Sequence, residues 1–199
     1  MDEMDLKAYE MIREYALRLS KRNYVTAHGG NISIRSGNTV WITRHASSLE
    51  DLQPEEVVRL RMDEPVGHDI IASTETPVHL NIYRKTSNLA VVHAHPPYAI
   101  VLSFYYDEFT PIDNEAGRVL RKVPVVEGSP GSDMLAENVA NALKKYHAVI
   151  VRAHGVFTTA KFLDVAYQFM CMVEHGARIF YLTEFFKSTG KKFIAPKYF

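Results

Sequence analysis

Two histidines separated by one residue stand inside an apolar stretch of the chain. His93 and His95 belong to the run Ala-Val-Val-His-Ala-His over residues 90–95, which two prolines follow. The run reads as a buried β-strand, and residues i and i+2 of a strand project from the same face. Two imidazoles that point the same way supply half of a tetrahedral zinc site. A pair of polar residues at a strand end is the alternative interpretation.

A third histidine, His154, stands two residues after the end of the apolar, β-branched run 148–152. It precedes Gly155. The chain must turn there, so this imidazole is well placed to face a cleft, although a polar residue that only caps the strand would have the same position. A catalytic zinc typically takes three protein ligands and keeps one position open. His93, His95 and His154 are therefore predicted to form a metal centre.

A carboxylate lies at the start of a predicted helix. Glu75 belongs to the sequence Ala-Ser-Thr-Glu-Thr-Pro over residues 72–77, in which Thr76 and Pro77 suit the cap and the first turn of a helix. Free N–H groups and the helix dipole favour an anion there, and Ser73 and Thr74 add hydroxyls. Glu75 can simply complement the helix dipole. Beside a three-histidine zinc it becomes a candidate fourth ligand or general base.

Two adjacent glycines, Gly29 and Gly30, precede Asn31. They let the backbone approach a ligand closely and offer N–H groups to a phosphate. The end of a helix would use a glycine equally well. Both interpretations remain open from the residues alone.

These residues need a scaffold in which strands alternate with helices. A first helix of about 18 residues is predicted, because apolar residues from Ala8 to Leu19 recur at helical spacing. The other predicted elements are a hairpin over 32–43, strands over 57–61, 90–95, 123–126 and 148–152, and helices over 76–85, 98–104, 134–146 and 162–186. This order predicts one α/β layered domain over residues 1–199, although the pattern does not decide between parallel and antiparallel pairing.

The composition narrows the range of partners. Lysine plus arginine number 23, as do aspartate plus glutamate, so the net charge suggests neither a nucleic-acid nor an acidic-membrane partner. The single cysteine, Cys171, lies in an apolar run and is interpreted as a buried thiol. No secretory signal is visible, and no apolar run approaches the ~20 residues that span a bilayer. A cytoplasmic protein is expected.

Four motifs together resemble the class II aldolase/adducin family. They are Gly29-Gly30-Asn31-Ile32-Ser33, Ser73-Thr74-Glu75-Thr76-Pro77-Val78-His79, His93-Ala94-His95-Pro96 and His154-Gly155-Val156. Each motif alone is weak, but their order and spacing match from residue 6 to about residue 186. The resemblance implies a three-layer α/β/α domain with a central, largely antiparallel sheet. It also implies a homotetramer with active sites at the subunit interfaces.

The resemblance further implies a reaction and the residues that perform it. The implied activity is zinc-dependent cleavage of a phosphorylated sugar, L-fuculose 1-phosphate or a related ketose 1-phosphate, to dihydroxyacetone phosphate and L-lactaldehyde through an enediolate, and the reverse aldol addition. Manganese or cobalt could replace zinc in the same ligand set. The positions that match are the zinc ligands His93, His95 and His154, the catalytic carboxylate Glu75, and the phosphate-binding residues Gly30, Asn31, Thr43, Ser73 and Thr74.

The chain departs from the family pattern at two places. The family usually has Thr-Pro-Ser/Thr-Gly where this chain has Thr43-Arg44-His45-Ala46, so Arg44 or His45 is expected to supply charge to the phosphate. Bacterial fuculose-phosphate aldolases use a tyrosine of a neighbouring subunit near residues 111–115, where this chain offers Asp113 and Glu115 as replacements. Tyr198 matches a second family tyrosine loosely.

Two other functions stay open. An L-ribulose-5-phosphate 4-epimerase or a sugar-phosphate dehydratase of the same family would keep the metal and change the reaction. An adducin-like interaction module would have lost the histidines, which are present here. The remaining histidines His68, His79, His147 and His175 are interpreted as structural, although His79, one turn after Glu75, could orient Glu75 or the metal ligands.

Overall fold

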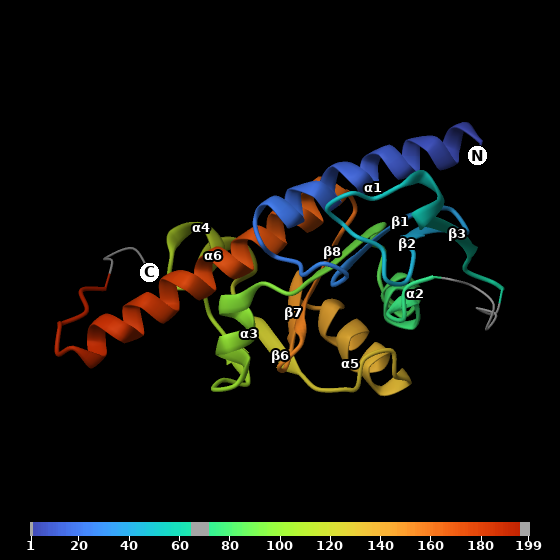
Figure 1. The fold of residues 1–199 in the computed structure, drawn as a ribbon. Helices are drawn as coiled ribbons and strands as arrows, with labels where there is room; N and C mark the ends of the chain where they lie inside the picture. Colours follow the sequence, from blue (N-terminus) through green and yellow to red (C-terminus); the bar gives the residue numbers. More distant parts are fainter. Residues whose placement is uncertain (1, 65–71, 196–199) are drawn as a thin grey trace.

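The computed structural model describes residues 2–64 and 72–195, and its strands form one sheet of eight (Figure 1). Their order across the sheet is β3-β2-β1-β4-β8-β7-β6-β5. All neighbouring pairs are antiparallel except β6 and β7, which are parallel. The strands are β1 (Asn31–Ser36), β2 (Thr39–Thr43), β3 (Val57–Arg61), β4 (Ala90–Ala94), β5 (Glu108–Phe109), β6 (Val123–Val126), β7 (Ala148–Val151) and β8 (Gly155–Ala160).

Helices cover both faces of the sheet, which gives the three layers that the family resemblance implied (Figure 1). One hydrophobic cluster joins the sheet to α1 (Glu3–Lys21), α3 (Pro97–Ser103), α4 (Asn114–Leu120) and α6 (Leu163–Ser188). A second cluster joins the opposite face to α2 (Thr76–Lys85) and α5 (Asp133–Leu143). A short 3-10 helix, Pro54–Glu56, precedes β3. The predicted α/β/α architecture with a largely antiparallel sheet is confirmed.

The alternation of side chains along β4 determines on which face of the sheet His93 lies. Ala90, Val92 and Ala94 pack in the α1/α6 cluster, whereas Val91 packs in the α2/α5 cluster. His93 has the parity of Val91, because successive side chains of a strand point to opposite faces. Asn31 of β1 and Phe157 of β8 are its register partners on either side. The residues around His93 therefore face the layer of α2 and α5.

Three elements lie where the sequence analysis placed none: β5, α4 and β8. The omission of β8 matters most, because β8 lies between β4 and β7 and brings His154 to the side of His93. Its sequence, Gly-Val-Phe-Thr-Thr-Ala, is fully buried. Gly155 was interpreted only as a turn residue, although the β-branched and aromatic residues after it favour a strand. The single predicted strand at 148–152 is thus the first arm of a hairpin.

Among the described residues, no helix combines the length and apolarity that crossing a membrane requires.

Candidate metal centre and active site

The imidazoles of His93, His95 and His154 converge at one end of the sheet. Each offers a ring nitrogen, and these atoms lie within 4.8 Å of one another. The Nε2 atoms of His93 and His95 are 3.1 Å apart. The ring centroids are separated by 4.9 Å between His93 and either neighbour and by 5.2 Å between His95 and His154. The structure thus brings together the three histidines that the sequence analysis selected.

The ring of His93 is held on two sides. Its Nδ1 lies 3.0 Å from the carbonyl oxygen of Val156, and since a carbonyl only accepts, Nδ1 carries the proton. The ring also stacks on Phe157 with 4.0 Å between centroids. His93 is completely buried. Its lone pair at Nε2 is therefore directed at the cluster by neighbours on β8.

His95 lies between the end of β4 and the start of α3. Its backbone N–H donates to the carbonyl of Tyr24 at 2.7 Å. Two residues later α3 begins, and the carboxylate of Glu174 on α6 accepts from the N–H groups of Tyr98 and Ala99 at 3.0 and 2.9 Å. Glu174 is buried, and burial raises its pKa to about 7. A carboxylate on the longest helix thus fixes the segment that carries His95.

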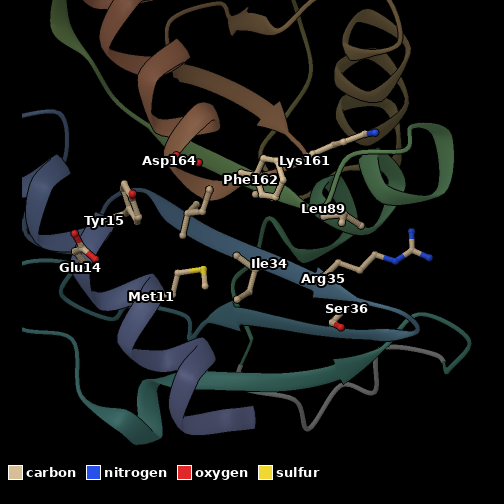
Figure 2. A pocket seen from close by; sticks show the side chains of 12 residues that line it. Met11, Glu14, Tyr15, Ile34, Arg35, Ser36, Leu89, Lys161, Phe162 and Asp164 are labelled. Carbon is tan, nitrogen blue, oxygen red and sulfur yellow. The ribbon is translucent and has the colours of Figure 1, made fainter.

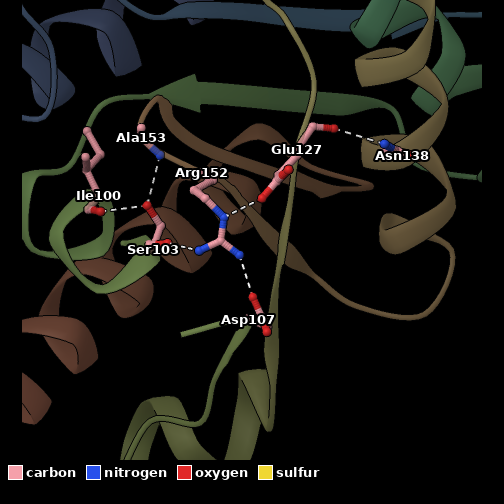
Figure 3. A network of polar contacts seen from close by, with 7 residues as sticks. All are labelled: Ile100, Ser103, Asp107, Glu127, Asn138, Arg152 and Ala153. Carbon is pink, nitrogen blue, oxygen red and sulfur yellow. Dashed lines mark hydrogen bonds and ion pairs between the residues drawn. The ribbon is translucent and has the colours of Figure 1, made fainter. Parts of the chain in front are cut away.

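His154 lies in the tight turn between β7 and β8. Ser103, at the C-terminal end of α3, contacts this turn (Figure 3). The N–H of Ala153 donates to Ser103 Oγ at 3.0 Å, and Arg152 contacts the Ser103 carbonyl, Asp107 and Glu127. Ala153 has a φ of 59°, in the left-handed region. Helix α3 therefore links the segment of His95 to the turn of His154.

Burial keeps the three imidazoles neutral. Desolvation is the largest cause of a lowered pKa at each of them, and the neighbouring imidazoles add to it at His93 and His95. The pKa of His93 lies well below its usual value, and that of His95 falls to about 4. Neutral imidazole is the form that binds a metal.

The cluster fits a divalent metal ion. Ligand nitrogens about 2.0–2.1 Å from a tetrahedral zinc lie roughly 3.3 Å apart, close to the separation of the two Nε2 atoms. His154 Nδ1 is buried without a hydrogen-bond partner among the described residues, and a buried polar atom of this kind needs a partner. The donor set of three neutral imidazoles suits zinc and related ions. No other described group of three or more His, Cys, Asp or Glu has this geometry.

Glu75 is a buried carboxylate at the start of α2. It is 4% exposed, its Oε2 has no hydrogen-bond partner among the described residues, and burial raises its pKa to about 6. Its carboxylate does not belong to the group of ligand atoms that lie within 4.8 Å of one another. A carboxylate with a raised pKa near neutrality suits proton transfer. Glu75 is thus a buried carboxylate outside the group of three nitrogens, with a pKa close to neutrality.

The glycine pair does not end a helix, because α1 stops at Lys21. Gly30 has a φ of 80°, and a Cβ there would lie 2.9 Å from the carbonyl oxygen of His93. A Cβ on Gly29 would lie 2.7 Å from His95 Nδ1. The glycines therefore let this loop pass directly against the histidine segment, and Asn31 follows as the register partner of His93.

The other predicted phosphate residues lie at the end of β2 and in the loop that precedes α2. Thr43 Oγ1 accepts from the N–H of Ile32 at 3.3 Å, and Thr43 is buried. Ser73 is buried and its hydroxyl accepts from the N–H of Glu75, whereas Thr74 is exposed. An isolated β-bridge between Arg44 and Ala72 joins the loop after β2 to the loop before α2. The structure thus places Thr43 and Ser73 on segments that meet.

The loop after β2 shows how the chain accommodates its departure from the family pattern. Ala46, at the position where the family has glycine, has a φ of 57°, which favours glycine. Ser47 follows, 4% exposed, and its hydroxyl has no hydrogen-bond partner among the described residues. The side chains of Arg44 and His45 are exposed. The backbone keeps a glycine-like conformation without the glycine.

The remaining candidates lie elsewhere. Asp113 caps α4, because its Oδ1 accepts from the N–H of Ala116 at 2.9 Å. Asp113 and Glu115 line a cavity of about 250 Å³ with Arg22 and His175. A contribution of either residue to the histidine cluster of a neighbouring chain stays a prediction. Tyr198 and His68 lie outside the described residues.

The sequence analysis did not find several supporting residues, and it interpreted His79 as structural with a possible role in orienting Glu75 or the metal ligands. Glu174 could have been selected from the sequence, since it is an acidic residue within the apolar run 162–186. Ser103 and Arg152 could not, because their roles depend on contacts between distant segments. His79 hydrogen-bonds Ser33 and Asn31 rather than Glu75.

A larger groove lies away from this site (Figure 2). Its volume is about 560 Å³, and it opens between α1, the end of β1 and the start of α6. Ile34 and Ala90, a register pair, belong to its lining, so it occupies the opposite end of the β1–β4 pair from Asn31 and His93. The lining is mainly apolar and holds no histidine. The groove is therefore distinct from the candidate metal centre.

The fold and the histidine cluster together define a protein with a candidate metal centre at the end of a largely antiparallel sheet between two helical layers. A sequence profile described as the class II aldolase and adducin N-terminal domain matches residues 10–181. The chain belongs to this family.

Relatives in this family include two kinds of enzyme. An L-fuculose phosphate aldolase of Methanococcus maripaludis strain S2 is 33% identical over 168 residues, which cover 82% of this chain and 91% of that protein. A methylthioribulose-1-phosphate dehydratase of Gallus gallus is 30% identical over 159 residues, covering 67% of this chain and 66% of that one. The crystal structure of L-fuculose-1-phosphate aldolase from Thermus thermophilus superimposes with a TM-score of 0.89 at 29% identity, covering 94% of this chain and all of that one. The family thus indicates an enzyme, either an aldolase or a dehydratase.

Proposed function

We propose that this chain is a zinc-dependent class II aldolase that cleaves L-fuculose 1-phosphate, or a related ketose 1-phosphate, to dihydroxyacetone phosphate and L-lactaldehyde. The observation that carries this proposal is the cluster of three neutral histidines with the buried carboxylate of Glu75 on the neighbouring α2. The aldolase relatives support the choice of reaction, since they match this chain over most of its length.

In this proposal His93, His95 and His154 hold the metal ion. When bound, zinc supplies a Lewis acid for the carbonyl and adjacent hydroxyl oxygens of the ketose. Cleavage of the C3–C4 bond requires one proton to leave the C4 hydroxyl and one to arrive at C3. Glu75 would move the proton at C3, because its burial and raised pKa suit a group that both takes and gives a proton.

The phosphate would be bound by Gly30, Asn31, Thr43, Ser73 and Thr74. Three of these residues are buried: Asn31, the register partner of His93, Thr43, which accepts from the N–H of Ile32, and Ser73, whose loop is bridged to the residue after Thr43. The start of α2 adds backbone N–H groups and a helix dipole that favour an anion. Arg44, whose side chain is exposed on the same loop as Ala46, would supply the positive charge that the departure from the family pattern calls for.

A homotetramer with active sites at subunit interfaces is part of the proposal. The C-terminal part of α6 extends beyond the rest of the fold (Figure 1). Apolar and aromatic side chains are exposed on this part of the helix. Exposed apolar patches of this kind mark interaction surfaces. Asp113, Glu115 or Tyr198 of a neighbouring chain would then serve the C4 hydroxyl. The exposed residues are Tyr181, Leu182, Phe185 and Phe186.

A sugar-phosphate dehydratase is the second candidate, favoured by the dehydratase relatives at 30% identity. The metal ligands and Glu75 would keep their places, and the proton removed next to the carbonyl would be followed by loss of a hydroxyl as water. The two reactions differ in products, because only the aldolase breaks a carbon–carbon bond. An L-ribulose-5-phosphate 4-epimerase would break the equivalent bond without releasing the fragments.

The test is a coupled assay for dihydroxyacetone phosphate released from L-fuculose 1-phosphate by purified protein, before chelation, after chelation and after zinc is restored. The proposal expects release that disappears on chelation and returns with zinc. In parallel, mass spectrometry of the methylthioribulose 1-phosphate reaction would detect loss of one water. Water loss from that substrate without cleavage of the ketose 1-phosphate would replace the aldolase by the dehydratase.

A further inference from the structure

Four buried polar side chains form a continuous row that ends at Asn31. The hydroxyl of Tyr83 lies 2.7 Å from Ser33 Oγ, Ser33 Oγ lies 2.6 Å from His79 Nδ1, and His79 Nε2 lies 2.5 Å from Asn31 Oδ1. Ser33 and His79 are completely buried, and Tyr83 is nearly so. Neither the metal cluster nor the proton transfer at Glu75 uses this row. A second function must account for it.

The direction of each hydrogen bond follows from the chemistry of the groups. An amide oxygen only accepts, so His79 Nε2 carries the proton that binds Asn31. No carboxylate is among the hydrogen-bond partners of His79 in the described residues, and a neutral imidazole then has its lone pair at Nδ1. Ser33 consequently donates to Nδ1 and accepts from Tyr83. All donors in the row point toward Asn31.

This direction fixes the orientation of the Asn31 side chain. With Oδ1 bound to His79, the amide nitrogen Nδ2 lies on the other side of the group, and it has no hydrogen-bond partner among the described residues. Two N–H bonds remain available at the start of β1, where Asn31 pairs with His93. A phosphate has only acceptor oxygens toward such donors. An amide turned the other way would present an oxygen and repel the anion.

We propose that His79 is a positioning residue for anion binding, which holds the amide of Asn31 with its NH₂ group available to the phosphate of the substrate. The inference rests on the proposed function, in which Asn31 binds that phosphate. Ser33 and Tyr83 act through His79 by keeping its proton on Nε2.

The test is a double-mutant cycle between positions 31 and 79 in the zinc-loaded protein. Binding of inorganic phosphate and of dihydroxyacetone phosphate is measured by calorimetry, with zinc content measured for each variant. His79→Leu and Asn31→Ala are each expected to weaken phosphate binding about tenfold, the scale of one lost charge-assisted hydrogen bond. The double variant is expected to bind no more weakly than Asn31→Ala alone, because His79 acts through Asn31.

Two further variants separate positioning from stability. His79→Gln, whose amide N–H can replace the Nε2–H donor, is expected to restore part of the phosphate affinity. Thr158→Val removes a buried hydroxyl that donates to the Ala166 carbonyl at 2.7 Å, outside the row, and should leave phosphate affinity unchanged. In turnover, His79→Leu should raise KM more than it lowers kcat. If His79→Leu does not fold, Tyr83→Phe takes its place in the cycle with a smaller expected loss.

Several results would overturn the inference. They are additive losses in the double variant, unchanged phosphate affinity in His79→Leu or in Asn31→Ala, and a wild-type protein that binds neither probe. Because binding is measured without turnover, a protein that binds phosphate as expected but cleaves no ketose 1-phosphate would contradict the proposed reaction alone.

Discussion

The three histidines stand at the ends of hydrogen-bonded strands, whereas much of the proposed phosphate site lies in loops 44–47 and 72–75. The ring of His93 is completely buried, stacked on Phe157 and bonded to Val156. The two loops are joined by one isolated bridge and contain Ala46 in a left-handed conformation. The metal half of the site, which is His93, His95 and His154, is thus built into the sheet. The anion loops, which are residues 44–47 and 72–75, lie outside its strands.

This difference separates two functional demands. Metal ligands need fixed geometry, and rigid strand ends supply it. Substrate choice is commonly carried by loops on a rigid scaffold. The departure from the family pattern at 44–46 falls in a loop, while all three histidines remain in or directly beside strand ends. We therefore expect relatives of this fold to share the metal half and to differ in the anion loops.

The largest expected effect comes from the metal half. His154→Ala should abolish stoichiometric zinc binding and lower turnover by at least about a thousandfold, because two ligands cannot replace three around a catalytic zinc. Zinc content and dihydroxyacetone phosphate release measure the two effects. His147→Ala is the matched control, since His147 stacks on Phe169 at the opposite end of β7 from His154 and should leave both unchanged. Full zinc occupancy with full activity in His154→Ala would place the metal elsewhere.

Glu75→Gln should separate metal binding from proton transfer. Zinc should be retained while turnover falls by about 10²–10⁴, the usual contribution of a general acid or base. In the wild type, Glu75 must be ionised to act as a base, so turnover should rise with pH through an acid limb at or below about 6. The limb lies below that value if the positive charge of zinc lowers the pKa of Glu75 from about 6. A variant that keeps wild-type turnover would assign the proton to another group.

The sequence predicts the metal ligands better than it predicts the residues that support them. His93 and His95 were found because their spacing along one strand fixes their common face, and His154 because it follows an apolar run. What local patterns could not provide was β8, which brings the two histidine segments together, or the contacts of Glu174, Ser103 and Arg152, which join residues about 50 to 76 positions apart. His79 was interpreted as structural, which its burial supports, but its contacts with Ser33 and Asn31 on β1 could not be predicted because they join distant segments.

Glu174→Gln tests the support that the metal half receives from α6. The pKa of Glu174 is raised to about 7 by burial, so the folded protein binds a proton more tightly than the unfolded chain. Its contribution to stability is therefore present at low pH and lost as pH rises from about 4.5 to 7, by on the order of 3 kcal/mol. Relative to the wild type, the glutamine variant should gain stability over this range.

Urea unfolding of both metal-free proteins at several pH values measures this difference. The comparison must be between the two proteins, because the histidines with lowered pKa values lose stability in the opposite direction as pH falls. Curves that stay parallel from pH 4.5 to 7 would show that Glu174 is ionised in the folded protein throughout.

The smallest expected effect compares the halves directly, because each contains one alanine in the left-handed region. Ala46 in the anion loops has a φ of 57°, and Ala153 in the turn before His154 has a φ of 59°. Glycine relieves the strain of this conformation, so either substitution should stabilise the protein by about 0.5–1 kcal/mol after the added entropy of the unfolded chain is counted.

The two glycine variants should differ in function. Ala153→Gly frees the backbone next to a metal ligand and should weaken zinc retention in a chelator competition, whereas Ala46→Gly should leave zinc unaffected and alter only phosphate affinity. If Ala46→Gly changed zinc retention as much as Ala153→Gly, the two halves would be mechanically coupled and the distinction between a rigid metal half and attached anion loops would fail. Equal stabilisation with separate functional effects would instead mean that this chain can vary its anion loops without disturbing its metal centre.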